Sequence, residues 1–209
     1  MSIQRENHWQ AVYRTKNATE VSWYAPHLDR SIELIREVAA PGAEIIDVGG
    51  GASTLVDDLL AGGFSAITVL DISQAALDIA QHRLGVHGRS VRWIQADITT
   101  ADLPAARYDV WHDRAVFHFL TETLDRRAYV ETLKRSVKDG GHVVIATFAL
   151  DGPPRCSGLD VVRYDGAALQ RQLGSPFELT RSFEESHATP AGKEQRFNFC
   201  RFRKTPAAG

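Results

Sequence analysis

Three aspartates, Asp47, Asp71 and Asp97, each stand at or next to the end of a short apolar run of the kind that forms a buried parallel strand. In open α/β sheets ligands bind outside the carboxyl ends of the strands. Asp71 lies 24 positions after Asp47, near the roughly 20-residue interval at which an acidic residue accepts hydrogen bonds from ribose hydroxyls. The three carboxylates are therefore predicted to converge on one nucleoside-binding crevice.

A run of glycines, Gly49, Gly50 and Gly51, follows Asp47. Glycine has no Cβ, so the backbone can turn sharply and a ligand can approach the main chain. The dinucleotide fingerprint carries a further glycine where this chain has Thr54, and the charge of Asp47 would repel a diphosphate but attract an ammonium group. The pattern favours a cofactor with a cationic head and no phosphate. Dinucleotide binding and a glycine turn without a ligand are the alternatives for this stretch alone.

A second group of chemically capable residues, His112, Asp113, Arg114 and His118, follows the fourth predicted strand. An imidazole has a pKa in the range needed to take a proton from an acceptor at neutral pH. His112, Asp113 and His118 are predicted to be catalytic, with Asp113 fixing the tautomer of a neighbouring histidine. The alternatives are packed or exposed imidazoles, and an ion pair between Asp113 and Arg114.

The elements that must position these residues follow from hydrophobic periodicity. Apolar runs predict parallel strands at 44–48, 66–71, 91–97, within 108–120 and at 142–148. Helix-type spacing predicts helices between them, and Ser53 or Thr54 is expected to cap the first helix after the glycines. Alternating segments at 177–184 and 195–203 predict a terminal antiparallel hairpin. The predicted fold is α/β: a doubly wound, mostly parallel seven-stranded sheet with a C-terminal hairpin.

The first 27 residues concentrate aromatic side chains, among them Trp9, Tyr13, Trp23 and Tyr24. Large aromatic rings offer flat faces for stacking and for cation–π contact. Residues 1–27 are therefore predicted to form a lid over a cationic cofactor, and residues 28–209 a single domain. Structural packing against the edge of the sheet is the alternative reading.

Composition narrows the function further. The chain has 209 residues, with 24 Lys and Arg against 26 Asp and Glu, so no general positive field attracts nucleic acid or an anionic membrane. No apolar stretch reaches the roughly 20 residues of a membrane span. The two cysteines, Cys156 and Cys200, show no metal-binding spacing, and no metal site is predicted. A cytoplasmic location is expected.

The Asp47-x-Gly49-x-Gly51 motif, together with Asp71 and Asp97, resembles the first motifs of the class I S-adenosylmethionine (SAM)-dependent methyltransferases. The resemblance covers nearly the whole chain. It implies SAM as the cofactor, with Asp97 accepting from the adenine amino group. The further cofactor-binding residues that this resemblance and the motifs suggest are Trp9, Trp23, Gly50, Ile72, Ile98 and His112.

The acceptor is expected to be the nucleophilic nitrogen, oxygen or sulfur of a small molecule, because the chain is short, slightly acidic and without an added recognition domain. Asp113-Arg114 resembles the Asp-Lys pair of the seven-β-strand protein lysine methyltransferases, whose continuation is missing here, so a protein acceptor is the main alternative. An NAD-dependent oxidoreductase and a non-catalytic SAM-binding protein are the alternatives from other classes. The oligomeric state is left open.

Overall fold

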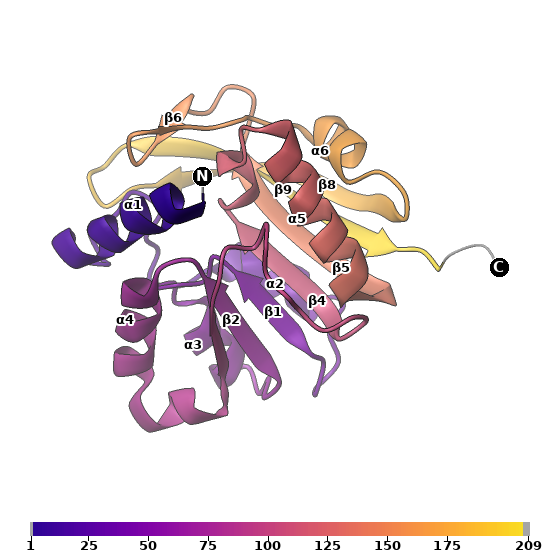
Figure 1. Ribbon diagram of the computed structural model, residues 1–209, viewed down its shortest axis with the longest axis horizontal. Helices are drawn as coiled ribbons and strands as arrows, with labels where there is room; N and C mark the ends of the chain where they lie inside the picture. Colours follow the sequence, from indigo (N-terminus) through magenta and orange to yellow (C-terminus); the bar gives the residue numbers. More distant parts are fainter. Residues whose placement is uncertain (1, 207–209) are drawn as a thin grey trace.

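The computed structural model describes residues 2–206, which form a seven-stranded sheet with helices on both faces (Figure 1). The strands of this sheet are β1 (Ile45–Val48), β2 (Ile67–Asp71), β3 (Arg92–Gln95), β4 (Tyr108–Arg114), β5 (Val137–Phe148), β8 (Phe177–Ala188) and β9 (Glu194–Lys204). A separate small hairpin contains β6 (Arg155–Cys156) and β7 (Leu159–Asp160).

The helices are α1 (Ser2–Thr15), α2 (Asp29–Arg36), α3 (Leu55–Ala61), α4 (Gln74–Leu84), α5 (Thr123–Ser136) and α6 (Gly166–Leu173), with two short 3-10 helices, η1 (Gly85–Ser90) and η2 (Phe117–Phe119). The strand order is β3-β2-β1-β4-β5-β9-β8. Strands β1 to β5 pair in parallel, whereas β9 is antiparallel to both β5 and β8. The predicted fold class is confirmed, including the terminal hairpin, which is longer than predicted.

Alternation along the central strands explains why helices cover both faces of the sheet. Successive side chains of a strand point to opposite faces. Ile45 and Ile67 pack with apolar residues of α2 and α3, whereas Ile46 and Leu70 pack with those of α5 and α6. Both sets are almost fully buried, so the strands read as continuous apolar runs.

The strand order indicates at which edge of the sheet a ligand site is expected. β1 lies between β2 and β4, so the chain leaves β1 toward one side and returns to β4 on the other. Val48 of β1 is level with Leu70 of β2 and with Asp113 of β4. The carboxyl ends of these strands therefore open side by side at the point where the direction of winding reverses, the usual place for a ligand in this class of sheet.

Of the two residues predicted to cap α3, Ser53 is the one that does so: its hydroxyl accepts from the Leu55 amide at 3.1 Å. Thr54 makes no capping bond, and its hydroxyl instead donates to the Ala25 carbonyl at 3.0 Å. One local prediction is corrected. The fifth strand begins at Val137 and not at 142, because the chain passes from α5 directly into strand pairing with β4.

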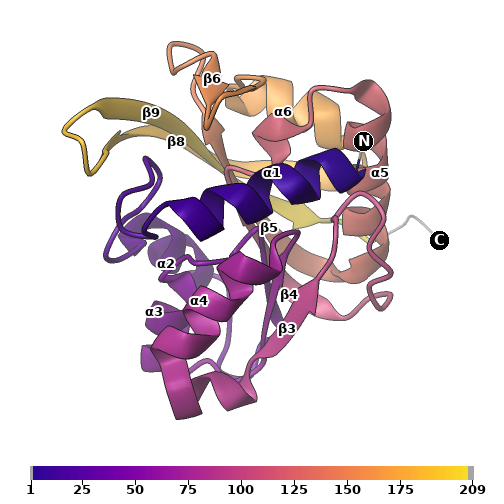
Figure 2. The ribbon, with the colours of Figure 1, turned by 60° about the vertical axis from the view of Figure 1, so that its left-hand side comes forward.

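Helix α1 lies beside α4 and across the carboxyl edge of the sheet (Figures 1 and 2). Polar contacts hold it there: the Gln10 side-chain oxygen accepts from the Ser73 hydroxyl at 2.7 Å and from the Ala75 amide at 2.8 Å. Within residues 2–206 no helix combines the length and the apolar character needed to span a membrane.

Candidate functional site

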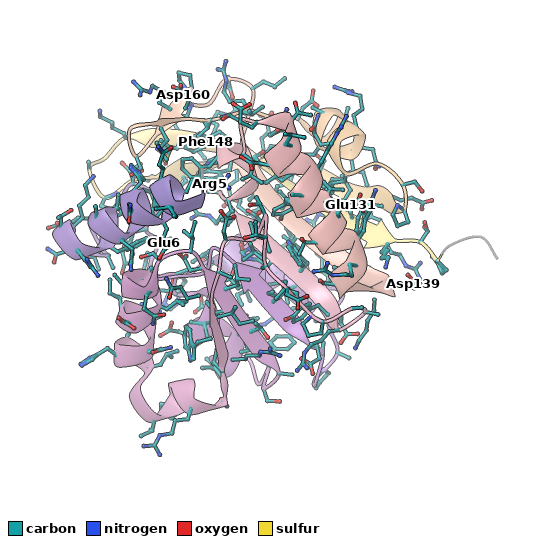
Figure 3. All side chains as sticks on the ribbon, in the orientation of Figure 1. Arg5, Glu6, Glu131, Asp139, Phe148 and Asp160 are labelled. Carbon is teal, nitrogen blue, oxygen red and sulfur yellow. The ribbon has the colours of Figure 1, made fainter. Side chains whose placement is uncertain are left out.

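A cavity opens at the carboxyl edge of the sheet under α1, with about 850 Å³ of empty space that includes space open to solvent. A concave and mostly apolar wall of this kind is typical of small-molecule sites. Asp71 and Asp97 line one part of it. Aromatic rings from widely separated parts of the chain line much of the rest: Trp9, Tyr13, Trp23, Phe119, Phe148 and Phe197. In Figure 3, Arg5 and Phe148 mark this region where α1 crosses the end of β5.

A second cavity, of about 490 Å³, adjoins the first at the glycine turn. Gly49, Trp23 and Arg114 line both cavities, and Asp47 and His112 line only the second. The turn after β1 thus lies between two neighbouring cavities. The larger has a mainly apolar wall that includes Asp71 and Asp97, and the smaller has Asp47 at its wall. A ligand with an apolar body and a short polar tail matches this pair of spaces.

Asp47 is held by a histidine but keeps one oxygen unpaired. Its Oδ1 lies 2.7 Å from Nδ1 of His112, whose Nε2 lies 2.9 Å from the Ser31 hydroxyl. A carboxylate only accepts, so Nδ1 carries the proton and donates to Asp47. Asp47 Oδ2 is buried and has no hydrogen-bond partner among the described residues. A buried carboxylate oxygen without a donor is costly, so a cationic group in the second cavity would relieve it.

The same contact corrects one prediction about the histidines. The tautomer of His112 is set by Asp47 and not by the adjacent Asp113, because parallel pairing of β1 with β4 places Asp47 directly opposite His112. The alternative ion pair between Asp113 and Arg114 is also absent among residues 2–206.

The three glycines leave no room for side chains. A Cβ on Gly49 would lie 2.0 Å from a methyl of Val116, and one on Gly51 would lie 2.5 Å from Asp71 Oδ2. Both residues have positive φ, 70° for Gly49 and 26° for Gly51, which L-residues with side chains rarely adopt. The turn therefore brings bare backbone against the two aspartates at the carboxyl ends of β1 and β2, Asp47 beside Gly50 and Asp71 beside Gly51.

Asp71 ends β2 at the wall of the large cavity and is only 6% exposed. Its Oδ1 accepts from the Ser73 amide at 2.8 Å. Burial raises the pKa of Asp71 to about 7, with the nearby Asp47 adding to the effect. Donors from a bound ligand would favour the ionised form of this carboxyl.

Asp97 is occupied by a residue that the motifs did not indicate. Arg5 of α1 donates to Asp97 Oδ2 at 2.9 Å and to Asp125 at 2.8 Å. The other oxygen of Asp97 accepts from the amide and hydroxyl of Thr99 at 2.9 and 2.7 Å. Ile98, the next residue, is buried and lines the cavity. Arg5 thus ties the first helix to the predicted adenine end of the site.

Asp113 lies buried behind the cavity and accepts several hydrogen bonds from the residues around it. It accepts from the Tyr129 hydroxyl at 2.7 Å and from the Val116 and Phe117 amides at 2.8 and 3.1 Å. Burial raises its pKa to about 6. These bonds fix the turn from β4 into η2, and the side chain lines neither cavity.

His118 is fully buried behind the same cavity wall. Its Nδ1 accepts from the Phe148 amide at 3.3 Å, and Nε2 has no partner among the described residues. Burial and the charge of Arg114 lower its pKa to about 3, so the ring is neutral at physiological pH. The ring also packs on Phe119 and Phe148, which do line the cavity.

The sequence motifs located most of the residues that surround these cavities. All of the predicted cofactor residues except Gly51 line one cavity or the other. The motifs missed Arg5 and Phe197 as lining residues, and they singled out Arg114 only as a charged neighbour of the predicted catalytic residues. Their positions depend on contacts between distant segments of the chain. Only for Arg114 did the sequence offer a signal, the density of charged residues between 112 and 118.

Comparison with known proteins agrees with this geometry. Residues 45–141 match the model of a family described as a methyltransferase domain. An uncharacterized methyltransferase of Mycobacterium tuberculosis is 34% identical over 104 residues, half of each chain. The eEF1A lysine and N-terminal methyltransferase of Mus musculus is 23% identical over 108 residues, 52% of this chain and 15% of that protein. The chain therefore spans half or less of the length of these relatives.

Solved structures share the fold along almost the whole chain. A protein whose structure was determined in work on the conversion of a disulfide bond into a thioacetal group during echinomycin biosynthesis superimposes with a TM-score of 0.77 at 17% identity, over 98% of this chain and 94% of that one. The 1,6-didemethyltoxoflavin-N1-methyltransferase of Burkholderia thailandensis, solved with S-adenosylhomocysteine (SAH), gives 0.73 at 19% identity, over 98% and 89%. The chain therefore has the fold of this methyltransferase, and its residues 45–141 match a methyltransferase domain.

The residues present fit SAM, the cofactor that the sequence motifs imply. The ammonium group of the methionine part would supply the donor that Asp47 Oδ2 lacks, and ribose hydroxyls would supply donors to Asp71. Ile72 and Ile98 offer apolar contact beside these acids for the adenine ring. Among residues 2–206 no group of three or more His, Cys, Asp or Glu side chains is placed to hold a metal ion.

A pH-dependent test follows from the raised pKa of Asp71, about 7. Asp71→Ala should weaken SAH binding by about 1 to 3 kcal/mol, the cost of unpaired hydrogen-bonding groups. In the wild type, SAH affinity should fall as the pH drops below 7, because protonation removes the charged acceptor, and this dependence should disappear in Asp71→Asn. Calorimetric titrations between pH 5.5 and 7.5 measure both effects.

Asp102→Ala, at an exposed acid outside the cavities, is the matched control and should bind SAH like the wild type. A well-folded Asp71→Ala protein with unchanged SAH affinity would remove Asp71 from the cofactor site.

Proposed function

We propose that this protein transfers a methyl group from SAM to a nitrogen, oxygen or sulfur atom of a small-molecule acceptor. One observation carries the proposal: the ends of β1, β2 and β3 bring Asp47, Asp71 and Asp97 to the walls of two adjoining cavities, with one oxygen of Asp47 buried and lacking a donor. A nucleoside with a cationic amino-acid tail satisfies these carboxylates together.

The residues of this chain would mainly bind and align. When bound, SAM would supply an electrophilic methyl group on a cationic sulfonium, which leaves as a neutral thioether. Because the sulfonium is already activated, alignment and exclusion of water would supply most of the catalysis. Trp9, Tyr13 and Trp23 would exclude water from above, and an acceptor that carries a proton would lose it to solvent or to a nearby base.

The shape of the cavity supports a small acceptor. Helix α1 and the segment up to Trp23 contribute to the walls of the large cavity, and the remaining wall carries Phe148 and Phe197. An extended polypeptide needs an open groove, whereas a small molecule fits an enclosed apolar space. The N1-methyltransferase of B. thailandensis, with its bound 1,6-didemethyltoxoflavin, has the same fold. A protein acceptor is the second candidate, because the mouse relative is a lysine and N-terminal methyltransferase.

Residues 1–27 are proposed to act as the lid of this site. Arg5, Trp9, Tyr13 and Trp23 all line the large cavity, and they reach it from a helix and loop outside the sheet. Trp9 meets Trp23 and Phe119 edge to face, with ring centroids 5.7 and 5.0 Å apart. Movement of this segment would open the cavity to ligands.

Two measurements test the proposed function. Isothermal titration with SAM, SAH and NAD should give tight binding for the first two and none for NAD. Incubation with tritiated-methyl SAM, first with a metabolite library and then with a cell lysate, should label a small molecule. Binding of NAD in place of SAM would overturn the proposal, and label found only in protein would favour the second candidate.

The catalytic roles of His112, Asp113 and His118 stay predictions. Because both ring nitrogens of His112 are engaged and His118 lies behind Phe119 and Phe148, either would act on an acceptor only after a local rearrangement. If His118 is the base, His118→Ala should lower kcat by about 10²- to 10⁴-fold with SAM affinity nearly unchanged. If His112 is the base, His112→Ala should lower kcat as much and should also weaken SAM binding, because it removes the donor to Asp47. Wild-type kcat in both variants would show that these rings only shape the site.

A further inference from the structure

Arg114, at the end of β4, places a cation in an otherwise aromatic wall. Its side chain lines the large cavity, and its guanidinium carbon lies 4.8 Å from the centre of the Phe197 ring. One nitrogen donates to the Trp23 carbonyl at 2.8 Å. Arginine offers five N–H donors in a planar fork that matches a carboxylate. The bond to the Trp23 carbonyl therefore uses only one of the N–H donors of Arg114.

No acidic side chain of the described residues forms an ion pair with this guanidinium, although Glu185 and Asp47 lie near enough to favour its charge. Within residues 2–206 no carboxylate lies within ion-pair distance of Arg114, and Glu185, the nearby acid of β8, accepts from Arg30 at 2.5 Å. Burial lowers the pKa of Arg114 to about 10, so the group is still a cation at neutral pH. A partly buried cation without a counter-ion is costly unless a ligand supplies the negative charge.

The other cation of the cavity shows the contrast. Arg5 also lines the cavity, but it is paired with both Asp97 and Asp125. Arg114 is the cation whose charge is left for a ligand among the described lining residues. Its guanidinium lies against Phe197, and its side chain also borders the second cavity, where Asp47 lies.

SAM itself carries a carboxylate, so Arg114 could bind either the cofactor or the acceptor. The position of its guanidinium distinguishes these two roles. The methionine part of SAM fits the second cavity, beside Asp47 and Gly50. Phe197, over which the guanidinium lies, lines the large cavity and does not line the second, although Phe197 and Arg114 also line a third cavity together with Glu185. The charged end of Arg114 thus lies against a ring of the large cavity that the space beside Asp47 does not share.

We propose that the acceptor is a planar aromatic molecule bearing a carboxylate, which Arg114 binds while the rings of Trp9, Phe148 and Phe197 enclose the aromatic body. Edge-to-face and stacked contacts between rings favour such a body over a flexible aliphatic chain. The guanidinium fixes one end of it and so sets which atom faces the methyl group. Arg114 is a specificity-determining residue in this scheme, which rests on the proposed function.

The test uses binding to the full-length protein saturated with SAH, so that no turnover is needed. The probes are benzoate, 2-naphthoate and indole-3-carboxylate, each paired with its neutral carboxamide. Calorimetry should show at least one carboxylate binding about tenfold or more tightly than its carboxamide. Arg114→Met should abolish this preference and Arg114→Lys should retain part of it. Arg92→Met, which removes the same charge from an exposed position on β3, should leave the preference intact.

Three results would overturn the inference. The first is a wild-type protein that binds no carboxylate better than its carboxamide. The second is a preference that survives in Arg114→Met. The third is a loss of more than tenfold in SAH affinity in Arg114→Met and Arg114→Lys, which would assign the guanidinium to the cofactor. The comparison of carboxylate with carboxamide in the wild-type protein tests the proposal without any variant, so a variant that folds poorly does not prevent the test. Failure of the wild type to bind SAH would reject the proposed function and not this inference.

Discussion

Gly51→Val is expected to reduce SAH affinity by more than a hundredfold while the sheet stays folded. A Cβ at this position would lie 2.5 Å from Asp71 Oδ2 and 2.9 Å from the Ala76 Cβ, so the new side chain must displace the carboxylate or the start of α4. The residue also has a φ of 26°, where a β-branched side chain adds backbone strain of about 1 to 2 kcal/mol. Calorimetric titration with SAH and the melting temperature measure the two consequences separately.

Gly63→Val is the matched control. Gly63 has a φ of 85° but nothing within 4 Å of its Cβ position, so it carries the strain without the collision. This variant should lower the melting temperature and leave the SAH affinity nearly unchanged. If Gly51→Val bound SAH within threefold of the wild type, the glycine turn would not be the cofactor site.

The site could be predicted where its signals are local. Asp47, Asp71 and Asp97 follow apolar runs, and parallel strands bring their carboxyl ends to one edge whatever the details of packing. The glycines permit the turn and a close approach of the ligand because they have no side chain, and this property can be read from the sequence alone. These features needed only the order of strands along the chain, which hydrophobic periodicity provides.

The rest of the site depends on register between distant segments. Phe148 and Phe197 share the cavity wall because β5 and β9 pair antiparallel with these residues opposite each other. His112 meets Asp47 through the register of β4 on β1, and a shift of one residue would turn it to the other face. No spacing in the sequence fixes such pairings, so the tautomer prediction chose the sequence neighbour Asp113.

The N-terminal helix was predictable as an aromatic segment, but its docking was not. Arg5 and Gln10 reach partners that lie far away in sequence, at Asp97, Asp125 and Ser73. Polar side chains of this kind are common on exposed helices, and nothing in their spacing marks these two as contacts. The contacts exist because α1 packs along α4.

Deletion of residues 1–15, the whole of α1, is expected to leave the domain folded but to weaken SAH binding by about ten- to a hundredfold, or roughly 1.4 to 2.8 kcal/mol. Val12 is the buried apolar residue of α1 among those described, and none of the main apolar clusters includes a residue of this helix. The deletion therefore removes Trp9 and Tyr13 from the cavity and Arg5 from Asp97 without opening the core.

Circular dichroism and the melting temperature should confirm that the truncated protein is folded, and calorimetry should give its SAH affinity. Arg5→Met, which removes the tie to Asp97 and Asp125 but keeps the aromatic rings, should lose less affinity than the deletion. That order is expected because burying an aromatic side chain contributes more than a partly exposed ion pair. A truncated protein with wild-type SAH affinity and turnover would show that α1 only covers the edge of the sheet, and the cavity would then have to close by another segment.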